Sequence, residues 1–231
     1  MKLKELIEER DVLIKELDKI SRSGQNEQKI KDYLSSLNSD MDEMLETVPT
    51  ISVKEFNDMI KQIFKTKYNI DAEFKILNHA FTDKDEERRL DFVLSLKREN
   101  SSSFDDFKLA SQSVRRNFIA SSSKFLVKLD KFLLRTIGVL DKSREWRELT
   151  NKYPEFKDVL LEVISQIKIN ELSKNKSLIA NMIEKKYKEL LSIDNSENEN
   201  STITKTDIQL EIEENKQELG ALETVIDSWK L

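Results

Sequence analysis

The sequence contains little glycine and proline and no cysteine. Its 231 residues include three glycines, two prolines and one histidine. About 7% glycine is typical of globular proteins, and three glycines are too few to supply the turns of a multi-stranded sheet. Because Gly24, Gly138 and Gly220 are far apart, the chain has no glycine-rich loop that could hold a phosphate. These shortages favour a chain built from helices.

The shortage of cysteine and histidine also restricts the chemistry. Zinc sites of the Cys/His type need several such ligands, and catalytic triads would have to use His79. A di-metal helical bundle uses Glu-x-x-His motifs, but Ile76 stands three residues before His79. Adjacent carboxylates such as Glu8 and Glu9 diverge on a helix and do not form an acid–base pair. We therefore expect no enzyme activity, no metal and no cofactor.

Long hydrophobic runs are absent as well. No stretch of about 18 apolar residues could span a membrane, and the acidic, evenly charged N-terminus is unlike a signal peptide. We expect a cytoplasmic or nuclear protein without a membrane span.

The net charge of −5 is unevenly distributed along the chain. Residues 108–190 contain 18 basic and 10 acidic side chains, whereas residues 194–231 contain 3 basic and 10 acidic ones. Because acids interleave with the bases in the middle segment, the favoured interpretation is a set of solvated helix faces.

Nucleic-acid binding through the basic middle segment is the alternative. Lysines 124, 128 and 131 and Arg135 step by 4, 3 and 4 residues, so they would form one line along a helix. Such a line can neutralise phosphates without reading sequence. The candidate phosphate-binding residues are Arg115, Arg116, Lys124, Lys128, Lys131 and Arg135.

The N-terminal segment, residues 1–48, is predicted to form coiled-coil helices. Residues 2–20 have a helical apolar pattern, Gly24 interrupts it, and a second pattern runs up to Pro49. A hairpin is favoured over a kinked rod. The residues predicted to pair on the second helix are Ile30, Leu34, Leu37, Met41 and Met44.

A helical bundle body is predicted over residues 52–191. Ser52 and Glu55 form a capping box that begins a helix ending near Tyr68. Residues 70–81 alternate as a strand would but also fit a helix, and helix is favoured because no partner strand is evident. Further helices are expected after Asp83 and from Ser103, the latter a central helix with phenylalanines at seven-residue intervals, at 118, 125 and 132.

The C-terminal segment has the clearest pattern. Residues 192–205 have few apolar side chains and are predicted to be a flexible linker. Residues 206–231 are predicted to form a heptad helix, starting at a Thr206–Gln209 capping box and pairing through Ile208, Ile212, Asn215, Leu219, Leu222, Ile226 and Trp229. Its partner is left open between residues 30–48, another copy and a different chain.

The sequence as a whole predicts an all-α fold, an elongated helical bundle with coiled-coil segments at both termini. The predicted function is that of a non-enzymatic structural or adaptor subunit. It would associate with protein partners, or with itself, through its coiled-coil segments.

Overall fold

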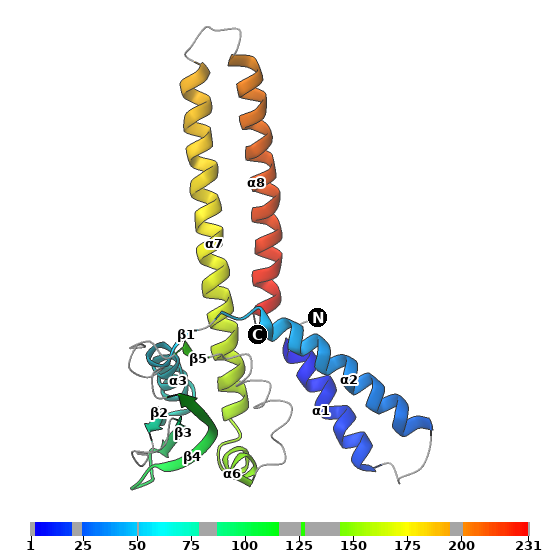
Figure 1. Ribbon diagram of the computed structural model, residues 1–231, viewed down its shortest axis with the longest axis vertical. Coiled ribbons are helices and arrows are strands. Elements are labelled where there is room, and N and C mark those ends of the chain that lie inside the picture. The colour runs from blue at the N-terminus through cyan, green and yellow to red at the C-terminus, as the bar shows by residue number, and fades with distance from the viewer. Residues whose placement is uncertain are drawn as a thin grey trace. The chain divides into compact units, whose positions relative to one another are not determined.

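The computed structural model of the protein describes residues 3–19, 25–49, 51–78, 87–115, 126–127, 144–194 and 201–230. The chain divides into two compact units, Leu3–Ile164 and a second that contains Ser165–Leu231. The first unit combines helices with a three-stranded antiparallel sheet, so the fold is a mixed one (Figure 1). The all-α prediction is therefore wrong.

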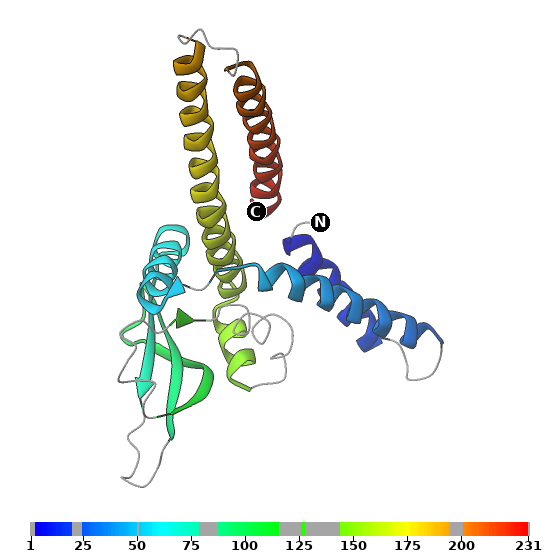
Figure 2. The same cartoon turned by 45° about the horizontal axis from the view of Figure 1, so that its top comes forward.

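Two antiparallel helices form the N-terminal part of the first unit. Helix α1 (Leu3–Lys19) and helix α2 (Gln25–Glu46) lie side by side in both ribbon views (Figures 1 and 2). The Tyr33 hydroxyl of α2 donates a hydrogen bond of 2.7 Å to the Glu9 carboxylate of α1. This bond ties the two helices together at their solvent-exposed surface.

Helix α3 (Val53–Tyr68) begins where the capping box predicts. The Glu55 backbone N–H donates to the Ser52 hydroxyl oxygen at 3.2 Å, and the Ser52 backbone N–H donates to the Glu55 carboxylate at 2.9 Å. The helix ends at Asn69, which has a φ of 51° and donates its N–H to the Lys65 carbonyl. Asparagine tolerates this left-handed conformation better than most residues, so it ends the helix without a glycine.

Three strands follow α3 where the sequence had predicted helices. Strand β2 (Ile70–Asn78) pairs antiparallel with β3 (Glu87–Arg98), which pairs antiparallel with β4 (Asp105–Arg115). The helical prediction for 70–81 is wrong over 70–78, and the helices expected after Asp83 and from Ser103 are replaced by β3 and β4. Two short strands, β1 (Ile51–Ser52) and β5 (Leu126–Val127), pair separately.

The two faces of the sheet differ in chemistry. Phe74 and its cross-strand partner Leu94 are buried on the face toward α3, where the Phe56 ring meets the Phe74 ring edge-on at 5.0 Å. The other face carries ion pairs, including Lys108–Asp91 at 2.8 Å. The central strand is buried along both faces from Leu90 to Leu96, which explains why its sequence lacks a clean two-residue alternation.

A β-bulge interrupts the pairing of β3 with β4. Val93 pairs with Lys108, whereas the preceding residue Phe92 pairs with Ala110, so Leu109 is the extra residue. Such a bulge increases the local twist of a strand pair. Leu109 is buried.

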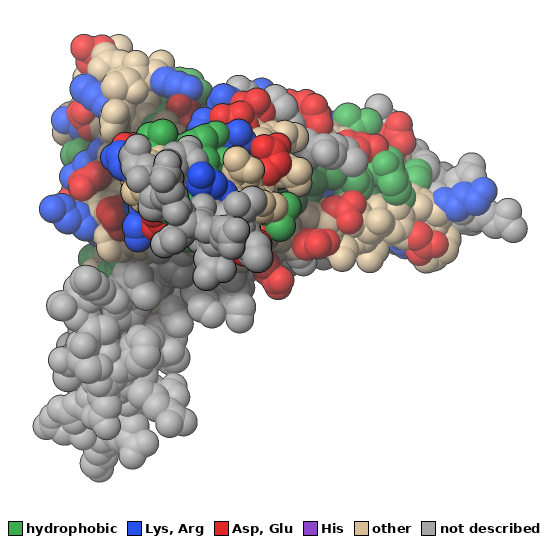
Figure 3. Space-filling view, turned by 90° about the horizontal axis from the view of Figure 1, so that it is seen from above, with side chains coloured by type: hydrophobic (Ala, Val, Ile, Leu, Met, Phe, Trp, Pro, Cys, Tyr) green, Lys and Arg blue, Asp and Glu red, His purple; other side chains and the backbone are tan. Residues whose placement is uncertain are grey.

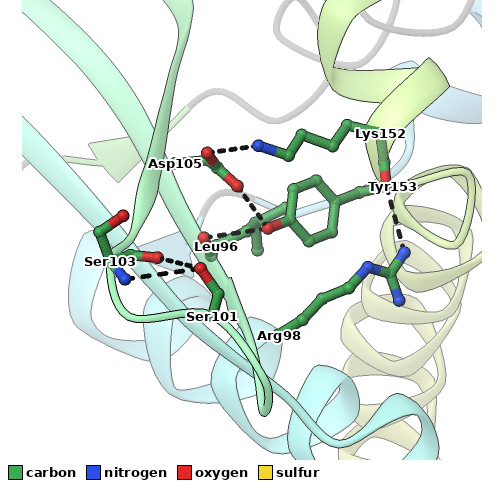
Figure 4. Close-up of polar contacts among 7 residues, drawn as sticks. All are labelled: Leu96, Arg98, Ser101, Ser103, Asp105, Lys152 and Tyr153. Atoms are coloured by element: carbon green, nitrogen blue, oxygen red, sulfur yellow. Dashed lines mark hydrogen bonds and ion pairs between the residues drawn. The ribbon is translucent and has the colours of Figure 1, made fainter.

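The turn between β3 and β4 contains no glycine. Ser101 donates its backbone N–H to the Arg98 carbonyl at 2.9 Å, and its hydroxyl donates to the Ser103 carbonyl at 2.9 Å (Figure 4). Serine side chains can replace backbone partners in turns in this way. The inference that three glycines exclude a multi-stranded sheet was therefore wrong, because Asn69 and Ser101 serve in place of glycine.

Helix α6 (Arg144–Lys152) and the start of helix α7 (Phe156–Asp194) complete the first unit. The Phe156 ring stacks against Phe64 of α3, with ring centroids 6.5 Å apart and an angle of 11° between the ring planes. Val159 and Leu160, one turn further along α7, are fully buried. The hydrophobic core of the unit thus unites α3, one face of the sheet and the first turns of α7.

The second unit is a helical hairpin of α7 and helix α8 (Ser201–Trp229), shown side by side in Figures 1 and 2. Helix α7 continues without a break through the polar residues 173–177, where the Ser177 hydroxyl donates to the Ser173 carbonyl at 2.9 Å. Helix α8 begins at Ser201, five residues before the predicted capping residue Thr206. Residues 192–194 and 201–205 of the predicted linker are helical.

Candidate protein-interaction site

The helices of the hairpin α7–α8 are joined by contacts on two sides. Lys186 pairs with Glu211 at 2.5 Å on one side, which we call the Lys186 side. The Lys216 ammonium lies 5.7 Å from the centre of the Tyr187 ring on the other side, which we call the Tyr187 side. Lys186 and Tyr187 are neighbours on α7, and their partners Glu211 and Lys216 stand five residues apart on α8.

A further ion pair fixes the register along the hairpin. Lys176 of α7 and Glu223 of α8 are 2.7 Å apart. Lys176 stands 11 residues before Tyr187, about three helical turns, so it lies on the Tyr187 side. The two ion pairs place each position of α7 opposite a defined position of α8.

Two lysines of the hairpin have a raised pKa. The hydrogen bond to the Glu211 carboxylate raises the pKa of Lys186, and the hydrogen bond with the Tyr187 hydroxyl raises the pKa of Lys216. Both ammonium groups therefore remain charged at neutral pH. Because Lys216 and Glu211 are exposed and Lys186 is only half-buried, the contacts define the register more than they stabilise the fold.

The predicted C-terminal pairing residues lie along the face of α8 that is turned toward α7. Four of them are buried (Ile208, Ile212, Ile226 and Trp229) and three are half-buried (Asn215, Leu219 and Leu222). On α7, Leu172 and Ile179 are buried. The apolar face of α8 thus lies along a helix of the same chain, and this helix was not among the three partners left open by the sequence.

The predicted N-terminal pairing residues lie on α2. Leu37 and Met41 are buried, and Ile30, Leu34 and Met44 are half-buried. Arg10 of α1, which interrupts the apolar pattern of that helix, is also buried and pairs with Asp11 at 3.3 Å.

The predicted phosphate-binding line mostly lies outside the described residues. Arg115 is the last residue of β4. Arg116, Lys124, Lys128, Lys131 and Arg135 are not among the described residues, and neither are the three phenylalanines at positions 118, 125 and 132. Where residues of the predicted central helix are described, at 105–115 and 126–127, they form strands. Phosphate binding stays a prediction.

The sequence missed the exposed apolar side chains of the hairpin. Leu178 and Met182 have exposed fractions of 61% and 52%, and Leu191 has 64%. Leu178, Met182, Tyr187 and Leu191 lie beside the buried stripe of α7, which includes Leu172 and Ile179. Their four-residue spacing, Leu178 to Met182 and Tyr187 to Leu191, is a signal of two further apolar lines beside that stripe.

These two lines lie on different sides of the hairpin. Met182 stands one turn before Lys186 and therefore belongs to the Lys186 side, with Leu178 a further turn away. Leu191 stands one turn after Tyr187 and belongs to the Tyr187 side. The hairpin therefore presents apolar side chains on both flanks of its helix–helix contact.

The strongest titration shift among the described residues belongs to a polar cluster in the first unit. We call it the Tyr153 cluster; its members are Arg98, Asp105, Lys152, Tyr153 and Glu155. Burial, and then the hydrogen bond to Asp105, raise the pKa of Tyr153 to about 12. The hydrogen bonds from Lys152 and then from Tyr153 lower the pKa of Asp105.

The geometry of the Tyr153 cluster joins the sheet to the turn between α6 and α7 (Figure 4). The Tyr153 hydroxyl lies 2.7 Å from the Asp105 carboxylate and 3.2 Å from the Leu96 carbonyl oxygen. Lys152 donates to Asp105 at 2.6 Å, and Arg98 donates to Glu155 at 3.0 Å. These contacts bind β3 and β4 to the start of α7.

The described residues contain no group of three or more His, Cys, Asp or Glu side chains placed to hold a metal ion. None of the helices described is both long enough and apolar enough to cross a membrane. In the face drawn in Figure 3, basic and acidic side chains are interleaved, with hydrophobic side chains between them.

Comparisons with protein-family models, with curated proteins and with solved structures found no match to this chain.

Proposed function

We propose that the protein is a non-enzymatic adaptor subunit of a multiprotein assembly, with the hairpin α7–α8 as its docking element. One observation carries this proposal. Among the described residues ten large hydrophobic side chains are exposed, and six of them lie on the hairpin: Leu178, Met182, Tyr187, Leu191, Leu210 and Val225.

Exposed apolar side chains gathered on one element are a feature of interaction surfaces. A helix in a two-helix hairpin covers only one of its faces with its neighbour, so apolar residues on its flanks need another molecule to bury them. Recognition by packing helices against such flanks is a common mode of protein association.

The polar chemistry of the first unit supports a non-enzymatic role. Tyr153 carries the strongest pKa shift, and its hydroxyl is buried and hydrogen-bonded to Asp105. A catalytic acid or base needs a pKa near the operating pH, whereas a phenol with a pKa of about 12 stays protonated. Its hydrogen bonds serve to position α7 on the sheet.

Affinity purification from the native cell tests the proposal. The wild-type chain should recover a defined set of proteins, and the double substitution Tyr187→Asp with Leu191→Asp should lose at least one of them. The reason is that two charges on the Tyr187 side oppose the burial of this flank against a partner.

The matched control is Val12→Asp, which places the same charge on an exposed apolar position of α1. It should retain the proteins that the hairpin variant loses. Recovery of the same proteins by all three chains at equal yield would contradict the assignment of the hairpin as the docking element. Circular dichroism of each variant establishes that the helices remain folded.

A further inference from the structure

The Lys186 side of the hairpin combines apolar and charged residues in an ordered way. On α7, Lys174, Leu178, Met182 and Lys185 are exposed and step by 4, 4 and 3 residues, so they form one line. The apolar pair therefore lies between two lysines. The next positions of this line, Glu171 and Glu189, pair with lysines of α7 itself, Lys168 and Lys186.

The neighbouring line on α8 is acidic. Asp207, Glu211, Glu214 and Glu218 are exposed and step by 4, 3 and 4 residues. Because Glu211 pairs with Lys186, this acidic line belongs to the Lys186 side.

Apolar residues of α8 continue the same line. Val225 stands 14 residues after Glu211, about four turns, so it shares this side. Val225 is exposed and Leu222, one turn before it, is half-buried.

The ion pairs show which residues of the two lines are level. Lys186 lies opposite Glu211, and Lys176 lies opposite Glu223. By the same register Lys185 is level with Glu214, and Leu178 and Met182 are level with the stretch between Glu214 and Leu222. The α7 edge of this face is therefore basic and apolar. The α8 edge is acidic from Asp207 to Glu218 and apolar at Leu222 and Val225.

A face with this arrangement is complementary to itself. A two-fold rotation about an axis parallel to the helices places α7 of one copy over α8 of another, antiparallel and at the same level. Lys185 then meets Glu214 of the second copy. Leu178, Met182, Leu222 and Val225 of both copies come together at the centre.

We propose that the chain forms a homodimer through this face, in which two hairpins build a four-helix bundle. The partner is a second copy because one hairpin carries both signs of charge that a match needs. Its lysines lie on α7 and its acidic residues on α8, on opposite edges of the apolar residues. A four-helix bundle also covers the flank that a two-helix hairpin leaves exposed. The proposal deepens the proposed function, since it assigns one side of the docking element to self-association.

Light scattering coupled to size exclusion tests the dimer on the full-length chain. The wild-type chain should have twice the 27.1 kDa mass of one copy at concentrations between about 1 and 100 µM, a range that covers moderate affinities. Leu178→Asp combined with Met182→Asp should halve the mass and leave the circular dichroism unchanged. The matched control Leu191→Asp, on the Tyr187 side of the same helix, should keep the dimer.

A charge exchange tests the orientation. Lys185→Glu should raise the dimer dissociation constant at least several-fold, and adding Glu214→Lys to it should restore association. Glu213→Lys is the control, because the residue next to Glu214 points about 100° away on a helix. Carbodiimide cross-linking of a mixture of ¹⁴N- and ¹⁵N-labelled chains should link Lys185 to Glu214 in mixed-isotope peptides.

The outcomes separate this proposal from the adaptor function. A wild-type chain that is monomeric up to 100 µM would overturn the dimer, and the adaptor function would stand if the affinity purification recovers partners that depend on Tyr187 and Leu191. A dimer that persists in the Leu178→Asp, Met182→Asp variant would overturn this face. A monomer whose Lys186 side binds another protein would assign the face to a different partner and overturn self-association.

Discussion

The core of the first unit and the hairpin differ in how they treat large apolar side chains. In the former, aromatic rings from distant parts of the sequence meet in one core, as Phe56 meets Phe74 and Phe64 meets Phe156. In the hairpin, Leu178, Met182 and Leu191 remain more than half exposed. The apolar side chains of the first unit bury one another, whereas burial of those on the hairpin requires another molecule. Stability should therefore depend on the former and association on the latter.

Two tryptophans, one in each region, allow the unfolding of the first unit and of the hairpin to be followed separately. Trp146 lies in α6 of the first unit, and Trp229 lies at the end of α8. These are the only tryptophans of the chain. Variants that retain only one of them report unfolding of one region at a time by fluorescence.

The largest effect on stability is expected from Phe56→Ala. Phe56 is fully buried against Phe74, and removal of a buried phenylalanine ring costs about 3–5 kcal/mol of unfolding free energy. Urea denaturation monitored through Trp146 measures the loss. Leu191→Ala in the hairpin is the counterpart and should change the free energy by less than about 0.5 kcal/mol; equal losses for the two variants would erase the proposed distinction.

Tyr153→Phe should have a smaller effect, about 1–2 kcal/mol, because it removes the hydroxyl that bonds to the Asp105 carboxylate and the Leu96 carbonyl. The substitution should also change how the stability of the fold depends on pH in the alkaline range. The pKa of Tyr153 is raised from 10.0 to about 12 in the folded state, so its contribution is complete below pH 10 and is lost as the pH rises toward 12. Urea midpoints between pH 9 and 11 should fall more steeply for the wild type than for the variant; parallel curves would contradict this.

Asp105→Asn probes the acid side of the same cluster. Since hydrogen bonds from Lys152 and Tyr153 hold the pKa of Asp105 below 3.8, the charged form stabilises the fold above that pH and the contribution is lost as the pH falls through the lowered pKa. The variant should therefore be less stable than the wild type at pH 7, and the difference should shrink at pH 2–3. The Lys152 ammonium is 58% exposed, so the ion pair itself contributes at most about 1 kcal/mol. A difference that stays constant with pH would show that packing, not charge, explains the loss.

Gly220→Ala in the hairpin is expected to have a small effect of the opposite sign. A methyl group at this position meets no atom within 4 Å, and alanine is favoured over glycine inside a helix by up to about 1 kcal/mol. The thermal midpoint followed through Trp229 should rise by a few degrees. A fall in that midpoint would indicate that a neighbour packs closely against Gly220.

The parts of the structure that depend on local signals could be predicted. Helix α3 begins directly after its N-cap Ser52 and ends at Tyr68, as expected, because its capping box and apolar pattern act over a few residues. The seven residues of the C-terminal pattern lie on one face of α8 for the same reason. Their partner α7 was not predicted, because the polar residues 173–177 interrupt its apolar pattern in the sequence. Each of these residues can nevertheless remain in a helix with its side chain in solvent.

The sheet could not be predicted because its evidence is non-local. Strand β2 alternates visibly, but its partner β3 is buried on both faces and its apolar run also fits a helix. The low glycine content added a misleading argument, since Asn69 and the serines near Ser101 form turns by other means. The exposed apolar lines of the hairpin were missed because, in the sequence, a single wide apolar face of α7 has nearly the same spacing as a buried stripe with an exposed line on each side of it.

The bulge in β4 bears on which changes of chain length the sheet tolerates. Residues on the two sides of Leu109 follow pairing registers that differ by one, so deletion of Leu109 merges them into one regular ladder and leaves every other residue on its present face. Deletion of Lys108, one position earlier, would put Leu109 in its place opposite Val93, on the charged face. Leu109 is therefore the position at which this strand can lose a residue without moving any other side chain, whereas loss of Lys108 would carry an apolar side chain onto the charged face.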